Sequence, residues 1–260
     1  MELASRLEWA RQIAVEAGKV TLDFYQTSGL NVETKADGSP LTLADQAAEK
    51  LLRTRIADRF PHDSIIGEEF GESRGTNEYR WILDPIDGTK SFICGVPLYG
   101  TMVGVELAGQ AVIGSIYFPP LDEGMYAARG MGAVHFRRGK SSSARVSKVS
   151  DLSQAVVLTT SVEAFSQRSA LESYLGLSKQ AKFARTWGDV YGYLLVATGR
   201  AEIMIDPLMN VWDAAALLPI IEESGGRFTD WQGQSRIDSG DSIGSNGLLH
   251  ELVVQQLRAR

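Results

Sequence analysis

The segment WILDPIDGTKSF, residues 81 to 92, constrains the fold of this chain most strongly. Its largely apolar start is suited to a buried strand, yet the run ends in Asp84 and Asp87, followed by glycine, threonine and lysine. Gathering charge at the end of a buried strand is unfavourable unless something offsets it. Either a turn, which Asp, Pro and Gly favour, or a bound metal ion explains the pattern. Taken alone, the motif indicates a turn.

Composition limits the classes of protein to consider. The chain has 260 residues, 44% of them hydrophobic, and a formal net charge of -6, which is typical of a globular protein with a sizeable core. A mildly acidic surface argues against nucleic acid as a partner, because phosphate backbones are bound by clustered Lys and Arg. Cys94 is the only cysteine, which excludes an intrachain disulfide and favours a reducing compartment.

The apolar segments are too short for membrane insertion. The N-terminal sequence MELASRLEWARQ carries early charges and lacks the apolar stretch of a signal peptide. No apolar run is of membrane-spanning length. We therefore expect a cytoplasmic protein without a membrane partner.

Hydrophobic spacing predicts two helices near the N-terminus, followed by a sheet. Apolar or small residues recur at helical spacing from Leu3 to Phe24, which indicates one long amphipathic helix. A second helix is predicted from Leu43 to about Arg59. Between residues 64 and 136, short strand-like runs separated by Gly, Pro and Asp predict a sheet.

Beyond residue 150 the pattern alternates between strands and helices. Helices are predicted there at about 165–175, 188–198 and 212–224, and from about 246. We expect one domain over residues 1–260, with an α+β half to about residue 145 and an α/β half from about residue 146. The fold class is α/β or α+β, with layered sheets and helices.

Carboxylates lie where several apolar segments end or helices begin, which are positions where a sheet presents chemistry to a crevice. They are Asp45, Glu68, Glu69, Asp84, Asp87, Asp206 and Asp213. Asp45 and Asp213 follow Thr42 and Asn210 by three residues, so each also fits a helix-capping pair. Carboxylates that converge from separate elements repel one another unless cations lie among them. Oxygen ligands without a Cys or His cluster favour Mg²⁺, with Mn²⁺ as the second choice.

The residues after Asp87 indicate the chemistry. Backbone amides of Gly88 and Thr89 would begin a helix whose N-terminus points at an anion, and phosphate is the natural guest. Bound Mg²⁺ ions would neutralise its oxygens and lower the pKa of a water. The sequence thus predicts metal-assisted hydrolysis of a phosphate ester.

Four blocks of sequence together resemble a known family. KADGSPLTLADQAAE begins at residue 35, GEE at 67, DPIDGT at 84 and WDAAALLPIIEESGG at 212. In this order they resemble the motifs of the inositol monophosphatase superfamily of lithium-sensitive, Mg²⁺-dependent phosphatases. The resemblance implies a five-layered αβαβα sandwich, as in fructose-1,6-bisphosphatase, a homodimer, two or three Mg²⁺ ions and a small phosphorylated metabolite as substrate.

The resemblance also assigns roles to residues. It implies side-chain metal ligation by Glu68, Asp84, Asp87 and Asp213, and a backbone carbonyl ligand from Ile86. It further implies that Thr89, with Asp45 as its partner, orients the attacking water, that the Gly88 and Thr89 amides hold phosphate, and that Glu69 lies just outside the ligand set.

The sequence DGTKSF separates this chain from the DGTTNF of ordinary inositol monophosphatases, because Lys90 replaces the second threonine. This version resembles the branch that hydrolyses histidinol phosphate. The likeness implies that Arg185, Asp189 and Asp206 line the leaving-group pocket, where carboxylates would pair with the cationic groups of histidinol. Surface exposure explains Lys90 and a helix start explains Asp189 equally simply, and capping suffices for Asn210.

Several alternatives stay open at this stage. Within the family, inositol-1-phosphatase and 3',5'-bisphosphate nucleotidase are the competing activities, and a small-molecule-binding regulator on the same fold is the non-enzyme alternative. The retained metal carboxylates argue against the regulator. GDSIG at 240 to 244 matches the esterase motif GxSxG, but it lacks the buried strand before it and the acid and base after it.

Overall fold

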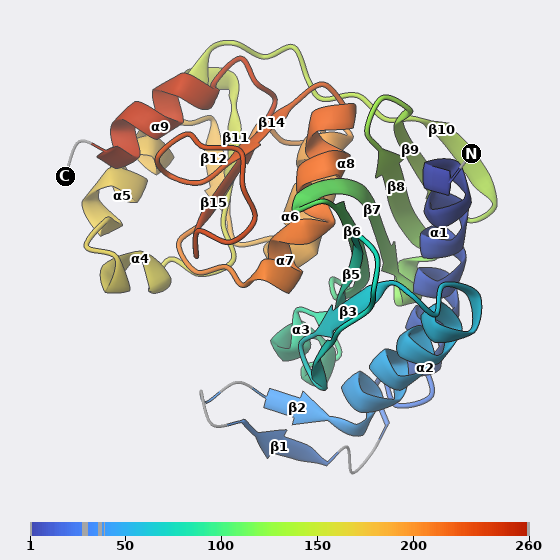
Figure 1. Ribbon diagram of the computed structural model, residues 1–260. Helices are drawn as coiled ribbons and strands as arrows, with labels where there is room; N and C mark the ends of the chain where they lie inside the picture. Colours follow the sequence, from blue (N-terminus) through green and yellow to red (C-terminus); the bar gives the residue numbers. More distant parts are fainter. Residues whose placement is uncertain (1, 28–30, 36–37, 39, 259–260) are drawn as a thin grey trace.

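The computed structural model describes residues 2–27, 31–35, 38 and 40–258. Within these residues, the two larger of three sheets alternate with three layers of helices (Figure 1). The arrangement is the αβαβα sandwich that the family resemblance implied. The organisation of residues 1–260 as one domain with a boundary near residue 145 stays a prediction.

An antiparallel-rich sheet of eight strands forms the larger β layer, with β3 and β5 as its parallel pair. The spatial order is β10-β9-β8-β7-β6-β5-β3-β4. The strands are β3 (Ser64–Gly67), β4 (Gly71–Ser73), β5 (Tyr79–Asp87), β6 (Gly100–Leu107), β7 (Gln110–Phe118), β8 (Glu123–Ala128), β9 (Gly132–Arg137) and β10 (Lys140–Ser143).

The outer helices α1 (Glu2–Thr21) and α2 (Leu43–Arg59) cover one face of this sheet (Figure 1). The stripe of apolar residues that predicted α1 is the face it buries, and Ala10, Ile13 and Ala14 are fully buried. An amphipathic helix gains most of its stability from packing of this kind. The bounds of α2 agree with the prediction, whereas α1 ends at Thr21, three residues before Phe24.

The middle helical layer separates the two sheets and consists of α6 (Asp189–Ala197), α7 (Val211–Ala215) and α8 (Leu217–Glu223). Helix α7 contacts β5 and β6, and α8 contacts β7 and β8. Glycines make this close approach possible, since a Cβ at Gly104 would lie 2.7 Å from the Ala215 Cβ. A Cβ at Gly114 would similarly meet the Ala216 carbonyl oxygen at 1.9 Å. The packing fixes α7 against the end of β5.

The smaller sheet has the order β12-β11-β13-β15-β14, and its outer face is covered by α4, α5 and α9 (Figure 1). Its elements are β11 (Val156–Leu158), β12 (Phe183–Arg185), β13 (Ile203–Asp206), β14 (Arg227–Thr229), β15 (Ser242–Ser245), α4 (Ala164–Gln167), α5 (Leu171–Gln180) and α9 (His250–Arg258). The remaining elements are β1 (Val32–Thr34), β2 (Pro40–Thr42), α3 (Thr89–Ile93) and the short 3-10 helices η1 (Pro119–Leu121) and η2 (Leu152–Gln154).

Three helix predictions in the second half are corrected. The helix predicted at 165–175 is two helices, α4 and α5, and between them Ser169 has a φ of 53°, which a continuous helix cannot accommodate. The helix predicted at 212–224 is divided into α7 and α8 at Ala216. The last helix begins at His250 rather than at about residue 246.

The GDSIG motif belongs to a strand. Ser242 lies in β15, is fully buried and shares a 2.5 Å hydrogen bond with the Tyr193 hydroxyl. It therefore has a structural position, in agreement with the rejection of an esterase site. Among the helices in the described part of the chain, none has the length and apolar character needed to cross a membrane.

Candidate active site

Three buried or half-buried aspartates converge where β5 ends and α7 begins. Carboxylate oxygens of Asp84, Asp87 and Asp213 all lie within 4.8 Å of one another. Asp84 and Asp87 are three residues apart, so in a regular strand their side chains would point to opposite faces. The β5–β6 pairing shifts register between them, which allows both carboxylates to join the same cluster.

Helix capping places two of the predicted carboxylates. The Asp213 carboxylate accepts hydrogen bonds from Asn210 N at 2.7 Å and from Asn210 Nδ2 at 3.3 Å. Asp45 accepts from the backbone amide and the hydroxyl of Thr42, at 2.7 and 2.6 Å. Both capping pairs that the sequence suggested are therefore present, and in both aspartates the bonds use Oδ2. A cap thus orients each carboxylate.

The three aspartates are close to other carboxylates, so their negative charges repel one another. Burial, followed by the charges of Glu68, Asp87 and Asp213, holds the pKa of Asp84 well above its ordinary value. Burial likewise raises the pKa of Asp213 to about 7. Within residues 2–27, 31–35, 38 and 40–258, no Lys or Arg forms an ion pair with any of these three aspartates. A hard cation with oxygen ligands fits this donor set.

Glu68 and Glu69 lie beside the cluster, at the end of β3, but have a cationic partner. Lys35 Nζ donates to Glu68 Oε1 and to Glu69 Oε1, both at 2.7 Å. The Glu69 amide also donates to the buried carboxylate of Glu49 at 2.7 Å. Burial raises the pKa of Glu69 to about 7. Sequence reasoning missed Lys35 and Glu49 as individual residues, although both belong to the N-terminal block that carries the family resemblance.

The residues after Asp87 form the start of α3. Gly88 has a φ of 84°, and a Cβ there would lie 3.0 Å from Asp189 Oδ2, so glycine is required. The Thr89 hydroxyl donates to the Ile86 carbonyl at 3.1 Å. In the part of the chain that the structure describes, Thr89 and Asp45 share no hydrogen bond, because the carbonyl and the cap engage them separately.

A small cavity of about 80 Å³ joins the cluster to the predicted leaving-group carboxylates. Asp87, Asp189, Asp206 and Asp213 all line it. Asp206 is 3% exposed and accepts from Thr160 N and from the Tyr193 hydroxyl, each at 2.9 Å. Burial raises its pKa. Its carboxylate therefore has protein partners on both oxygens.

Asp189 lines both this cavity and a second cavity of about 480 Å³. Gly88, Thr89 and Lys90 also line the second cavity. The backbone of Asp189 has a φ of 51°, a strained conformation for a residue other than glycine. Its amide donates to Thr160 Oγ1 at 2.8 Å. Burial, and then the charge of Asp206, raise the pKa of Asp189 to about 6, against the opposing effect of Lys90.

One predicted pocket residue, Arg185, behaves differently from Asp189, and one residue that was not predicted, Thr160, contributes to the site. Arg185 is exposed, donates to the Ala184 carbonyl at 2.7 Å and lies over the Phe183 ring, and it lines neither described cavity. Thr160, which the sequence did not single out, hydrogen-bonds both Asp189 and Asp206. The only local signal for Thr160 was its position at the end of the strand-like run AVVLTT, residues 155–160.

Fold and site together define a class of protein: a phosphohydrolase with a layered αβαβα fold, whose buried carboxylates suit a divalent cation. The chain belongs to the inositol monophosphatase family, whose sequence model matches residues 2–260. The predicted family and the prediction of a phosphoric monoester hydrolase are thereby confirmed.

Individual relatives agree with this assignment. A histidinol-phosphatase of Chlorobaculum parvum is 44% identical over 237 residues, 91% of this chain and 90% of that protein. A histidinol-phosphatase of Streptomyces coelicolor is 36% identical over 98% of this chain and 97% of its own length. The solved structure of an IMPase of Thermotoga maritima superposes with a TM-score of 0.86 at 29% identity, covering 98% and 97% of the two chains.

Proposed function

We propose that this protein is a Mg²⁺-dependent phosphatase that hydrolyses L-histidinol phosphate to L-histidinol and phosphate in histidine biosynthesis. The observation that carries the proposal is the 44% identity to the histidinol-phosphatase of Chlorobaculum parvum over nine-tenths of both chains. The carboxylate-lined cavity beside the acidic cluster supports it, because histidinol carries an ammonium group and an imidazole.

Asp84, Asp87 and Asp213 would hold the metal together with Glu68 and the Ile86 carbonyl. When bound, Mg²⁺ would neutralise phosphate oxygens, lower the pKa of the attacking water and stabilise the departing alkoxide. We keep the predictions of two or three Mg²⁺ ions and of Mn²⁺ as a possible substitute. Glu68 is included because its charge acts on Asp84 and Asp213, although Lys35 is its present partner.

The chain's own groups would position the reactants. Thr89 and Asp45 would orient the water, whose oxygen forms the new bond to phosphorus while the bond to the leaving oxygen breaks. The Thr89 hydroxyl already donates a hydrogen bond to the Ile86 carbonyl, and both residues lie close in sequence to the aspartates proposed to bind the metal. Backbone amides of Gly88 and Thr89 would hold the phosphate at the start of α3.

Asp189 is the strongest candidate for pairing with the leaving group. It lines both cavities, and its carboxylate lies beside Gly88, whose amide would hold the phosphate. Asp206 would contribute its negative charge to the pocket without contacting the leaving group, because Thr160 and Tyr193 already donate hydrogen bonds to it. Arg185 is left out of the proposed pocket, since its guanidinium is engaged at the surface.

The test is phosphate release from L-histidinol phosphate, inositol 1-phosphate and adenosine 3',5'-bisphosphate in parallel, each with Mg²⁺ and with EDTA. We expect an EDTA-sensitive preference for histidinol phosphate. Equal or higher rates on either other compound would overturn the substrate assignment and leave the metal site in place. Absence of release from all three, with Mg²⁺ still bound, would favour the non-enzyme alternative.

The Asp189→Asn variant tests charge pairing with the leaving group. We expect kcat/KM for histidinol phosphate to fall about tenfold or more, while that for inositol 1-phosphate, a substrate without cationic groups, changes little. Asp58→Asn, at an exposed position on α2, is the matched control and should leave both values unchanged. Equal losses on both substrates would show that Asp189 has a structural role.

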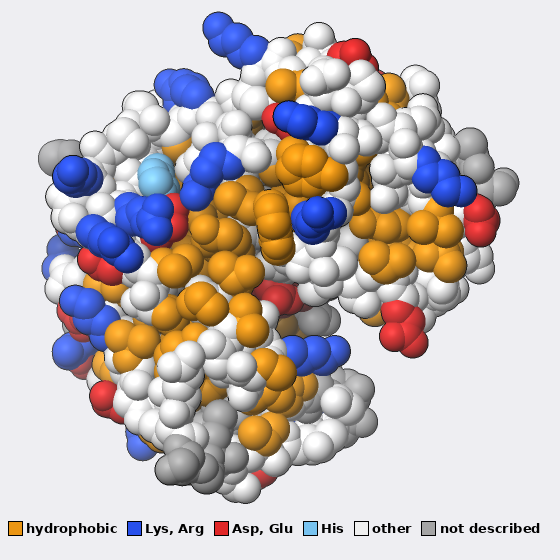
Figure 2. All heavy atoms as spheres, turned by 180° about the vertical axis from the view of Figure 1, so that it is seen from behind, with side chains coloured by type: hydrophobic (Ala, Val, Ile, Leu, Met, Phe, Trp, Pro, Cys, Tyr) orange, Lys and Arg blue, Asp and Glu red, His pale blue; other side chains and the backbone are white. Residues whose placement is uncertain are grey.

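The predicted homodimer and cytoplasmic location are kept as part of the proposal. Figure 2 shows apolar side chains gathered over the middle of one face, with Lys and Arg along its flank. Apolar surface of this kind is typical of faces that a subunit interface covers. Light scattering during size-exclusion chromatography would give the mass in solution, and a monomer mass would refute the dimer.

A further inference from the structure

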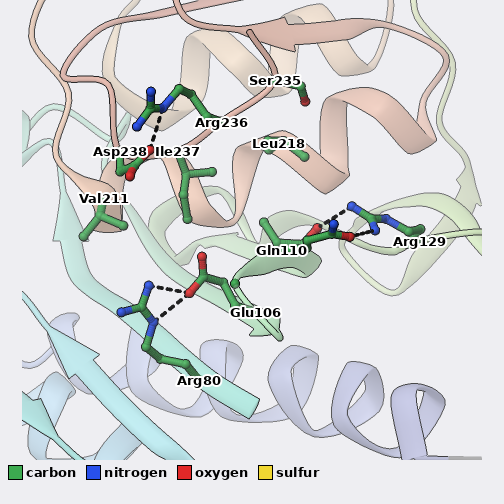
Figure 3. A pocket seen from close by; sticks show the side chains of 12 residues that line it. Arg80, Glu106, Gln110, Arg129, Val211, Leu218, Ser235, Arg236, Ile237 and Asp238 are labelled. Carbon is green, nitrogen blue, oxygen red and sulfur yellow. Dashed lines mark hydrogen bonds and ion pairs between the residues drawn. The ribbon is translucent and has the colours of Figure 1, made fainter. Parts of the chain in front are cut away.

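A third cavity, of about 540 Å³, shares no lining residue with the two cavities of the candidate active site. It lies where β5 and β6 meet the start of α7 and the loop that follows β14 (Figure 3). Three arginines and two carboxylates line it, together with apolar residues of α7, α8 and the loop. The volume is in the range of small-molecule sites.

Glu106 supplies a buried negative charge to this cavity. It is 4% exposed, and its Oε2 accepts from Arg80 Nε at 2.6 Å. Its other carboxylate oxygen points into the cavity (Figure 3). A deeply buried carboxylate with an oxygen directed into a cavity favours a cationic hydrogen-bond donor there.

Two arginines provide positive charge: Arg236 on the wall opposite Glu106, and Arg129 on one side of the cavity (Figure 3). Arg236 is half exposed and uses Nε to donate to Asp238 at 2.7 Å, which leaves its terminal nitrogens for other acceptors. Arg129 donates to Gln110 Oε1 at 2.6 Å. In Figure 3, Arg236 and Glu106 lie on opposite sides of Val211 and Ile237.

Because both arginines and carboxylates line the cavity, their charges restrict the kind of ligand that fits. A simple anion would be attracted by the arginines but repelled by Glu106 and Asp238, and a simple cation would meet the reverse. A molecule that carries both charges can place each of them beside a lining residue of opposite charge. Its apolar part can contact Val211, Leu218 and Ile237.

We propose that this cavity binds a small zwitterion, namely a free α-amino acid with an apolar side chain. Its ammonium group would lie at Glu106 and its carboxylate at Arg236. The proposal does not depend on the substrate of the active site, because the two sites have no lining residue in common.

The test is isothermal titration of the full-length protein, in EDTA, with L-leucine, L-valine and L-phenylalanine. Isopentylamine, which lacks the carboxylate of leucine, and 4-methylpentanoate, which lacks its ammonium, are the matched probes. We expect saturable one-site binding of at least one amino acid with a Kd of about 1 mM or below, and at least about tenfold weaker binding of both analogues.

Variants locate the binding. Arg236→Gln removes an exposed guanidinium, so the fold should be unaffected, and we expect about tenfold weaker amino-acid binding with unchanged phosphate release. Arg74→Gln, an exposed arginine paired with Glu72 outside the cavity, should change neither. The proposal is overturned by lack of saturable binding, by equal affinity in Arg236→Gln, or by 4-methylpentanoate binding as tightly as leucine.

Discussion

The protein buries carboxylates in two contrasting ways. Glu123, on β8, is completely buried, hydrogen-bonds His135 Nε2 at 2.8 Å and accepts from Arg200 Nη2 at 2.9 Å. Burial alone would raise its pKa, yet His135 and the nearby guanidinium groups outweigh this and hold the pKa of Glu123 below its ordinary value. The chain thus supplies its own counter-charges.

Asp84 is also buried, at 2% exposed, but its surroundings are the opposite. Its neighbours are carboxylates, and its pKa is held well above the ordinary value by burial and by their charges. A buried carboxylate that forms ion pairs within the chain contributes to the stability of the fold. Buried carboxylates that are close to one another and lack such partners require a bound cation to balance their charge. Surroundings, rather than burial, therefore separate the structural acid from the proposed functional one.

Removal of one cluster charge should have the largest effect. In Asp84→Asn the side chain keeps an oxygen for the Ile86 amide, which donates to Asp84 Oδ1 at 3.0 Å. We expect Mg²⁺-dependent phosphate release to fall about a thousandfold, or about 4 kcal/mol in transition-state stabilisation, because a metal ligand is lost. Without metal, the variant should be at least as stable as the wild type, since repulsion is relieved.

Steady-state phosphate release and thermal unfolding in EDTA provide these two measurements. Asp58→Asn, an exposed carboxylate on α2, controls for loss of a charge elsewhere. Wild-type activity in Asp84→Asn would remove this residue from the proposed ligand set.

The reverse result is expected for the paired acid. Glu123→Gln leaves Arg200 and Arg137 without their buried counter-charge, and we expect the free energy of unfolding to fall by about 3 kcal/mol. Phosphate release per folded molecule should be unchanged. Urea unfolding measures the loss, and Glu72→Gln, which breaks the exposed pair with Arg74, should cost less than about 1 kcal/mol. A stable Glu123→Gln protein with impaired catalysis would reverse the comparison.

Metal addition should separate the two sites in a single experiment. A ligand that binds only the folded state at a hundred times its Kd stabilises the protein by about 2.7 kcal/mol. We expect Mg²⁺ to raise the unfolding temperature of the wild type and of Glu123→Gln alike, and to have a much smaller effect on Asp84→Asn. Differential scanning calorimetry with and without Mg²⁺ tests this, and equal stabilisation of all three proteins would place the main metal site elsewhere.

The sequence predicted those parts of the fold and site that depend on local patterns. The apolar stripe of α1, the capping pairs at Asp45 and Asp213, and the acids that end β5 are all readable from residues close together in the chain. Thr160 was missed because its role depends on β11 lying beside β13, which brings it to Asp206. Arg185 was expected in the pocket from its position in the motif, but side-chain direction is set by tertiary packing.

His250 is a third case, in which a buried titratable group is kept neutral. Its substitution has the smallest effect that we predict. His250 is fully buried, with Nε2 2.9 Å from the Thr229 hydroxyl and Nδ1 2.8 Å from the Ser245 hydroxyl. Burial, with Arg227 acting in the same direction, lowers the pKa of His250 to about 4. Since the unfolded chain binds this proton more readily, the free energy of unfolding should fall as pH drops from about 6.5 toward 4.

Between pH 8 and pH 5 this group should remove about 2 kcal/mol from the free energy of unfolding. Other buried acids also titrate in this range, so the relevant quantity is the difference between the wild type and His250→Gln. Urea unfolding at both pH values should show a smaller advantage of the wild type at pH 5 than at pH 8, because glutamine has no proton to gain. An advantage that does not change with pH would mean that His250 contributes through packing and hydrogen bonds alone.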